Sequence, residues 1–185
     1  MNLNRHLNMP SAHAFLSPSK HSWINYEEAK LDRVFMAHQA SLRGNELHEF
    51  ASRAIALGVK LPDNDKTINR YVNDAIGYRM TPEQNLFYSP NCYGQADALG
   101  FRINRLRVHD LKTGTTPTSM DQLRIYAALF CLEYRFKPSE IEMELRIYQN
   151  DDVKIDVPDP MDILIIIQKI IEFDKRITYL REETE

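Results

Sequence analysis

An acid and a lysine lie two residues apart in Asp110-Leu111-Lys112, within the segment 108–114. Side chains two residues apart on a strand point to the same face, so this spacing puts a carboxylate beside a cation. A second acid, Asp97, ends the segment Gly94-Gln95-Ala96-Asp97, across a predicted hairpin. Carboxylates bind hard cations such as Mg²⁺, and a lysine can meet a phosphate. Two acids and a lysine on one strand pair are what metal-dependent phosphodiester cleavage requires.

Each of these residues has an expected role. Asp97 and Asp110 are predicted to hold Mg²⁺ or Mn²⁺, and the backbone carbonyl of Leu111 could complete the ligand set. Such an ion lowers the pKa of a bound water and neutralises charge growing on the phosphate. Lys112 would orient the attacking water or hold a non-bridging oxygen. The alternative for Asp110 and Lys112 alone is a surface ion pair, worth under about 1 kcal/mol.

Hydrophobic periodicity predicts the elements that position these residues. Helices are expected at 22–40 and, after an interruption at Gly44 and a cap at Asn45, at 46–57, closed by Gly58. The face with Leu47, Phe50, Ala51 and Ala54 should meet the core. A short helix is expected within 63–76, and residues 1–20 read as a loose lead-in.

Strands are predicted at 86–89, 93–101 and 105–112, with a tight turn at Ile103-Asn104. Thr118 or Ser119 should cap a helix that runs to Tyr134. Alternation over 141–147 predicts a half-buried strand, 153–157 a further one, and Asp159-Pro160 the start of a helix to about residue 181. This order predicts an α/β fold with a mixed central sheet flanked by helices, in one domain over 1–185.

Composition limits the class of protein. The net charge is −3, yet Arg102, Arg105, Arg107, Lys112 and Arg124 form a basic cluster near the acid and lysine, which is either a solvated face or a nucleic-acid contact. Two cysteines, Cys92 and Cys131, indicate a reducing setting. No apolar run has the length of a signal peptide or a membrane span, so we expect a soluble, cytoplasmic protein without membrane partners.

Four motifs in order resemble the RecB-like branch of the PD-(D/E)XK nuclease superfamily. They are Gly44-Asn45-Glu46-Leu47-His48-Glu49, the G-x-x-D of 94–97, the D-x-K of 110–112, and the Q-x-x-x-Y of Gln122 to Tyr126. The motifs cover the motif-bearing core, 44–126. The resemblance implies a restriction-endonuclease-like αβββαβ core with additional helices at both ends, the last at 160–182. It also implies that His48 is an added metal ligand, and that Gln122 and Tyr126 position the DNA or the surroundings of the catalytic lysine.

Departures from the family narrow this expectation. The chain has no G-x-x-x-x-G-K-[ST] phosphate loop, and two cysteines cannot hold a four-cysteine iron–sulfur cluster. The resemblance therefore implies a stand-alone nuclease core, with a phage or prophage origin and a bacterial host cell as its setting.

The expected function is an Mg²⁺- or Mn²⁺-dependent DNase, with an exonuclease favoured, that binds DNA through Arg102, Arg105, Arg107 and Arg124. The alternative is a nuclease-fold module that binds DNA or a protein without turnover. RNA stays open as the substrate, because attack at phosphorus does not require a particular sugar. Glu46 and Glu49 are alternative carboxylates, and His109 is expected to be structural. The apolar side chains of the last helix either cover the sheet or form a homo-oligomer interface, and a recombination or replication protein is a possible partner.

Overall fold

The computed structural model describes residues 14–183, and the chain divides into two compact units, one ending at Arg43 and one beginning at Gly44. In the first unit a 3-10 helix, η1 (Pro18–Asn25), precedes helix α1 (Glu28–Leu57). The indole Nε1 of Trp23 donates to the carbonyl of Ser17 at 2.9 Å, and the rings of Phe15 and Phe35 pack edge to face. The α-helix predicted at 22–40 therefore starts later, at Glu28, and η1 covers the end of the predicted lead-in and the first residues of that predicted helix. Residues 1–13 of the lead-in lie outside the described part of the chain.

Helix α1 continues through Gly44 and Asn45, so the predicted interruption and the Asn45 cap are wrong. A glycine inside a helix costs about 1 kcal/mol relative to alanine, so the sequence pattern alone favours a break at Gly44. A glycine is needed at position 44 because α1 passes close to Thr113: a Cβ at Gly44 would lie 2.8 Å from the Thr113 hydroxyl. Gly58, with φ of +67°, ends the helix as predicted. Ala51 and Ala54 are buried as predicted, whereas Leu47 and Phe50 are exposed.

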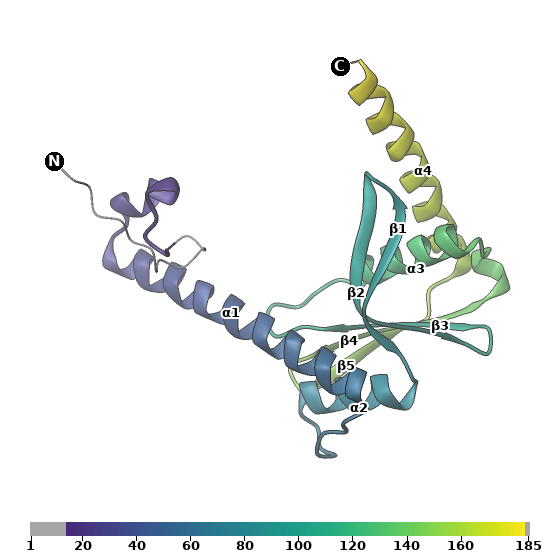
Figure 1. Ribbon diagram of the computed structural model, residues 1–185, viewed down its shortest axis with the longest axis horizontal. Coiled ribbons are helices and arrows are strands. Elements are labelled where there is room, and N and C mark those ends of the chain that lie inside the picture. Colours follow the sequence, from purple (N-terminus) through teal and green to yellow (C-terminus); the bar gives the residue numbers. More distant parts are fainter. Residues whose placement is uncertain (1–13, 184–185) are drawn as a thin grey trace, which may run out of the picture. The chain divides into compact units, whose positions relative to one another are not determined.

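The second unit is an α/β structure built on a five-stranded mixed sheet (Figure 1). Its spatial order follows the sequence: β1 (Thr81–Ser89), β2 (Cys92–Arg102), β3 (Arg105–Leu111), β4 (Glu142–Gln149), β5 (Asp152–Asp156). Neighbouring strands are antiparallel except for the parallel pair β3 and β4. That parallel pair requires a crossover, which α3 (Asp121–Tyr134) and the short 3-10 helix η2 (Pro138–Glu140) supply.

Two hairpins of the sheet close on residues with left-handed backbone. Ile103 and Asn104 have φ of 49° and 58°, which confirms the predicted turn between β2 and β3. Asn150 and Asp151 have φ of 54° and 58° and join β4 to β5. Positive φ at both positions is the signature of the type I′ turn, whose twist matches that of the strands it connects. The Asp151 carboxylate then accepts from the N–H of Thr67, at the start of α2 (Thr67–Gly77).

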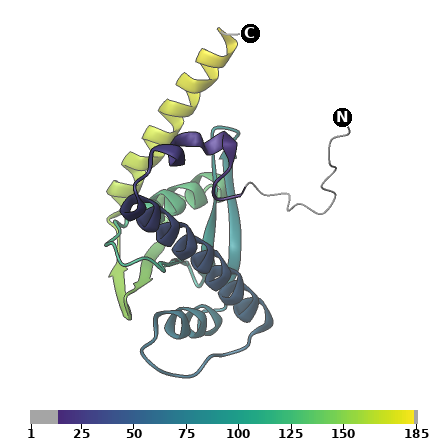
Figure 2. The ribbon, with the colours of Figure 1, turned by 90° about the vertical axis from the view of Figure 1, so that its left-hand side faces the viewer.

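Helices cover the two faces of the sheet (Figures 1 and 2). Helix α3 packs on one face, and α4 (Pro160–Glu182) packs against α3 and η2. Ile163 and Ile167 are the buried residues of α4, so the side chains predicted to cover the sheet instead pack mainly on α3. The other face holds α2 and the part of α1 after Gly44, around Tyr71, Val72 and Tyr148.

The sequence predicted the N-cap of α4 correctly but not that of α3. Asp159 caps α4 as expected, because its carboxylate accepts from the N–H of Met161 at 2.7 Å. The cap expected at Thr118 or Ser119 of α3 is wrong, since the N-cap is Met120. The hydroxyl of Ser119 still accepts from the N–H of Asp121 at 3.4 Å, two residues on. The predicted helix within 63–76 begins at Thr67.

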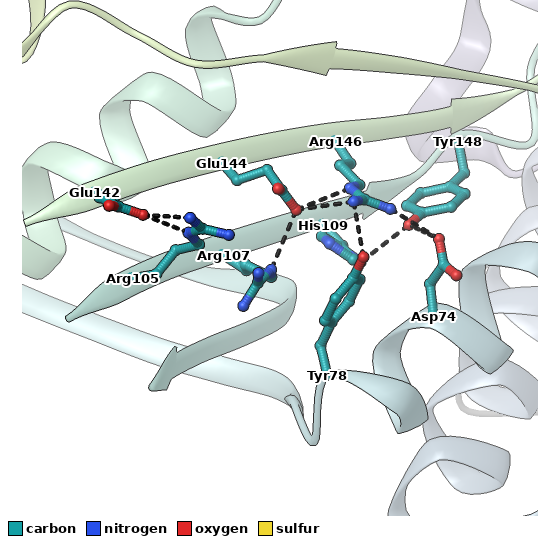
Figure 3. Close-up of polar contacts among 9 residues, drawn as sticks. All are labelled: Asp74, Tyr78, Arg105, Arg107, His109, Glu142, Glu144, Arg146 and Tyr148. Atoms are coloured by element: carbon teal, nitrogen blue, oxygen red, sulfur yellow. Dashed lines mark hydrogen bonds and ion pairs between the residues drawn. The ribbon is translucent and has the colours of Figure 1, made fainter. Parts of the chain in front are cut away.

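Charged pairs line the sheet face that carries α2 (Figure 3). Arg105 pairs with Glu142 across β3 and β4, and Arg107 pairs with Glu144 at 3.1 Å. Arg146 continues the row to Asp74 of α2 at 3.0 Å. This alternation of acids and arginines is the polar half of the predicted strand 141–147. No helix within residues 14–183 is long and apolar enough to cross a membrane.

Candidate active site

Asp97 of β2 links three elements of the second unit. Its Oδ2 accepts from the backbone N–H of Leu111, at the end of β3, at 2.8 Å. The same oxygen lies 3.4 Å from Nδ1 of His48 on α1. Antiparallel pairing of Ala98 with His109 brings Asp97 next to Asp110 on the neighbouring strand. The structure therefore brings His48, Asp97 and the D-x-K segment together.

Asp110 is buried and lies against Lys112, the first residue after β3. The ammonium Nζ of Lys112 is 2.9 Å from each carboxylate oxygen of Asp110 and donates its hydrogen bond to Oδ1. The same ammonium donates to Oε1 of Gln122 on α3, also at 2.9 Å. Within the described residues, Oδ2 of Asp110 is buried and accepts no hydrogen bond. Asp110 and Gln122 thus hold the lysine ammonium together.

The second residue of the Q-x-x-x-Y motif holds β2. The hydroxyl of Tyr126 donates to the backbone carbonyl of Gln95 at 2.5 Å, two residues before Asp97. Gly94 makes this approach possible, because a Cβ there would lie 3.1 Å from Cε1 of the Tyr126 ring. Gln122 and Tyr126, one helical turn apart, therefore anchor α3 to both strands that carry the acids.

Burial raises the pKa of both carboxyls, and neighbouring charges modify each pKa. Burial raises the pKa of Asp97, against the Leu111 N–H and the charges of His48 and Lys112, which lower it. Burial, followed by the charge of Asp97, raises the pKa of Asp110, while Lys112 lowers it. Desolvation and a like charge both disfavour ionisation, so the folded protein holds these two acids at an electrostatic cost.

Two further residues near the acids were missed in the sequence. Tyr71 of α2 is buried, and burial followed by the charge of Asp97 raises the pKa of its phenol. Glu83 of β1 raises the pKa of Asp97 through its charge and has left-handed backbone, with φ of 51°. The positive φ of Glu83 cannot be recognised from its residue type. Tyr71 belongs to none of the four motifs, and only the fold brings α2 close to Asp97.

A second D-x-K tripeptide, Asp152-Val153-Lys154, occurs on β5. Both of its charged side chains are exposed on the edge strand. Asp110, by contrast, is only 3% exposed. The tripeptide alone does not mark a site; burial and the neighbours Asp97 and Gln122 distinguish the first copy from the second. A concavity of about 260 Å³ lies beside that first copy, lined in part by Lys112, Thr113 and Lys66.

The four arginines expected to bind nucleic acid do not form one patch. Arg102, Arg105 and Arg107 lie at the β2–β3 turn end of the sheet, and Arg105 and Arg107 are paired with acids of β4. Arg124 belongs to α3, on the other face, and pairs with Asp156 at 2.9 Å. The four arginines are close in the sequence, but the fold places Arg124 on the other face of the sheet from Arg105 and Arg107.

The remaining expected site residues are His109, Glu49 and the backbone carbonyl of Leu111. His109 is buried against Tyr148, whose hydroxyl is 3.2 Å from its Nδ1, and burial followed by the charge of Arg146 lowers its pKa. Glu49 is paired with Arg53 on the surface of α1. The role of the Leu111 carbonyl stays a prediction. Across residues 14–183, no group of three His, Cys, Asp or Glu side chains is arranged to hold a metal ion.

Comparison with protein-family models, curated proteins and solved structures finds no match to this chain. The resemblance to the RecB-like nucleases rests on its four motifs.

Proposed function

We propose that this chain is an Mg²⁺- or Mn²⁺-dependent deoxyribonuclease with a RecB-like PD-(D/E)XK core. The observation that carries the proposal is the meeting of Asp97, in the middle of β2, with Asp110 and Lys112 at the end of the adjacent strand β3. His48 on one side and Gln122 on the other join the same cluster. All four sequence motifs thus contribute to one place in the fold.

The donor set fits a hard divalent cation. Burial disfavours ionisation of both carboxyls, and the charge of Asp97 disfavours that of Asp110 further, so a positive charge between them would be favourable. Oxygen is the donor that such cations prefer. The buried Oδ2 of Asp110 lies 2.9 Å from the Lys112 ammonium but accepts no hydrogen bond from the described residues, so it retains acceptor capacity for a cation. Asp97, Asp110 and the Leu111 carbonyl would hold the ion, with His48 beside Asp97. These oxygen donors include only two acidic side chains, so two or more waters would complete the coordination of Mg²⁺.

When bound, the cation supplies an acidified water and neutralises charge on the phosphate. The protein's own residues then have distinct tasks. Lys112 points its ammonium at the acids and can hold a phosphate oxygen or the attacking water. Gln122 keeps that ammonium in place, and Tyr126 fixes the backbone of β2 beside Asp97. These last two act through other residues, so we assign them a positioning role.

A binding module without turnover is the second candidate. The ion pair between Lys112 and Asp110 and the contact between His48 and Asp97 partly neutralise both acids without a metal. A protein that only holds DNA could retain such pairs for stability. The two functions differ in one measurable respect, since a binder releases no nucleotides under any metal condition.

The test is digestion of linear and circular DNA, single- and double-stranded, and of RNA, with Mg²⁺, Mn²⁺ or EDTA. We expect metal-dependent cleavage of DNA, with linear substrates favoured if the enzyme is an exonuclease. Asp110→Asn and Lys112→Ala should each lower the rate on the order of 100-fold or more, the usual loss for one electrostatic group at a reacting centre.

The second D-x-K supplies the matched control. Asp152→Asn and Lys154→Ala make the same chemical changes on β5 and should leave cleavage unchanged. Equal loss in both pairs of variants, or no cleavage by the unmodified protein, would reject the nuclease proposal. Retained DNA binding without cleavage would support the binding module.

A further inference from the structure

A concavity of about 530 Å³ lies at the β2–β3 turn end of the sheet, away from the D-x-K segment. Four arginines line it from three places in the chain: Arg79 after α2, Arg102 at the end of β2, and Arg105 and Arg107 of β3. Glu142 is the one acid among its lining residues. The concentration of positive charge is notable in a chain whose net charge is −3.

Two of these arginines are held in place by the sheet (Figure 3). Nε of Arg105 donates to Glu142 at 2.7 Å, and Nε of Arg107 donates to Glu144 at 3.1 Å. The guanidinium carbon of Arg107 also lies 4.2 Å from the centre of the Tyr78 ring. A cation over an aromatic face and beside a carboxylate loses less freedom when it binds a further anion.

The other two arginines, Arg79 and Arg102, are exposed, and their guanidinium groups make no hydrogen bond or ion pair with the residues that the structure describes. The backbone N–H of Arg79 donates to the carbonyl of Ile76 at 3.0 Å. Arg79 has left-handed backbone, with φ of 54°, which turns the chain from α2 into β1. Arg102 precedes the type I′ turn at Ile103, whose side chain is 99% exposed. Tight backbone geometry at both positions projects each arginine from a fixed point at the rim.

We propose that this concavity binds phosphate groups of a nucleic-acid strand, at a place separate from the candidate active site. Arg105 and Asp110 are five residues apart on β3, about 17 Å at roughly 3.3 Å per residue. Arg105 and Arg107 also alternate with Asp110, so they face the opposite side of the sheet. Contacts here would therefore hold a strand without touching the bond to be cleaved. This inference rests on the proposed function only for its choice of nucleic acid as ligand.

Phosphate suits this site better than a single carboxylate. A guanidinium presents a planar fork of donors, and a phosphodiester chain offers successive anionic oxygens to several forks. Arg79 and Arg102 lie on separate segments and can meet different phosphates of one strand. A free nucleotide shares the same chemistry but cannot reach as far as a chain of phosphates.

The experiment measures binding of a fluorescent 20-nucleotide single strand to the full-length protein in EDTA, across a series of salt concentrations. Each phosphate contact on a single strand contributes about 0.7 to the slope of log affinity against log salt. Arg79→Ala/Arg102→Ala should therefore lower the magnitude of that slope by about 1.4. Arg79→Lys/Arg102→Lys retains both charges and should keep most of it. Circular dichroism checks that each variant is folded.

The control is Lys154→Ala/Lys175→Ala, which removes two exposed cations elsewhere and should leave the slope nearly unchanged. An unchanged slope in Arg79→Ala/Arg102→Ala, or an equal fall in the control, overturns the proposal. Displacement of the strand by deoxyadenosine monophosphate at matched phosphate concentration also overturns it, in favour of a nucleotide site. Because EDTA prevents cleavage, the result is independent of the nuclease proposal. Absent cleavage with a lowered slope rejects only the nuclease, and cleavage with an unchanged slope rejects only this site.

Discussion

At the residue scale, the proposed chemistry depends on two carboxyls, the half-buried Asp97 and the buried Asp110. Asp97 and Asp110 lie on adjacent strands, and burial together with their own repulsion raises the pKa of Asp110. The buried carboxylate of Asp110 is costly to ionise in the metal-free protein, even though its Oδ2 lies 2.9 Å from the Lys112 ammonium, and a bound cation would lower that cost. A site assembled for binding is thus expected to oppose folding when it is empty.

Asp110→Asn should therefore stabilise the metal-free protein at pH 7. The folded-state pKa of Asp110 is raised, so its contribution to stability is fully present below the unfolded value of about 3.9 and is lost as pH rises through the folded pKa. Asparagine has no charge to bury, so the variant avoids that loss. Thermal unfolding in EDTA from pH 4 to pH 8 should show a gain that grows with pH. Asp152→Asn should show no such trend, and a destabilised Asp110→Asn at pH 7 would contradict the assignment.

Gln122 should affect turnover through Lys112 rather than through substrate binding. Its Oε1 accepts from the lysine ammonium, so Gln122→Ala removes one of the lysine's two anchors. We expect kcat to fall about 10-fold, the equivalent of one hydrogen bond of about 1.4 kcal/mol, with KM nearly unchanged. Gln122→Glu keeps an acceptor oxygen and should recover part of the loss. A rise in KM at constant kcat would instead indicate contact with the DNA.

The residues of the site could be found in the sequence because their order and types were informative. The second D-x-K tripeptide, on β5, shows the limit of that reasoning, since Asp152 and Lys154 match the motif but lie exposed on an edge strand. Glu83 could not be found in the sequence, because its charge acts on the pKa of Asp97 through the fold and not through any spacing along the chain.

At the scale of elements, strands and turns followed local rules while helix α1 did not. The turn at Ile103-Asn104 and the cap at Asp159 depend on residues next to one another, so the sequence predicted them. Gly44 has a long-range reason instead, the close passage of α1 over Thr113. That contact joins the helix of His48 to the segment after Lys112, and a propensity scale cannot see it.

Gly44→Ala should reveal this contact in a double-mutant cycle. Alanine for glycine inside a helix normally stabilises by about 0.4–1 kcal/mol, but here the new Cβ would meet the Thr113 hydroxyl. We expect no gain, or a loss, from Gly44→Ala alone, and a gain of up to about 1 kcal/mol when it is added to Thr113→Ala. Gly77→Ala in α2, where a Cβ would meet nothing within 4 Å, is the control that should stabilise without a partner. Urea unfolding gives all four corners of the cycle, and additive effects at Gly44 and Thr113 would refute the coupling.

At the scale of the whole molecule, the two faces of the sheet carry different kinds of side chain. The face beneath α3 carries an apolar core and the Lys112–Gln122 contact, and the face with α2 carries a row of charged pairs ending in the arginine-lined concavity. The strand alternation at 141–147 predicted that one face would be polar. It did not predict that this face would be partly covered, because the position of α2 depends on packing around Tyr71 and Tyr148.

A metal ion should couple the site to the stability of the second unit as a whole. A cation that binds only the folded state adds RT ln(1 + [M]/Kd), about 2.7 kcal/mol at 100 times Kd. Mn²⁺ or Mg²⁺ should therefore raise the Tm of the unmodified protein, and Asp110→Asn should lose most of that rise. The order of stability then reverses between conditions, with the variant ahead in EDTA and the unmodified protein ahead in saturating metal. Differential scanning calorimetry of both proteins with and without Mn²⁺ measures this reversal, and an equal rise in both would show that the cation binds somewhere other than Asp110.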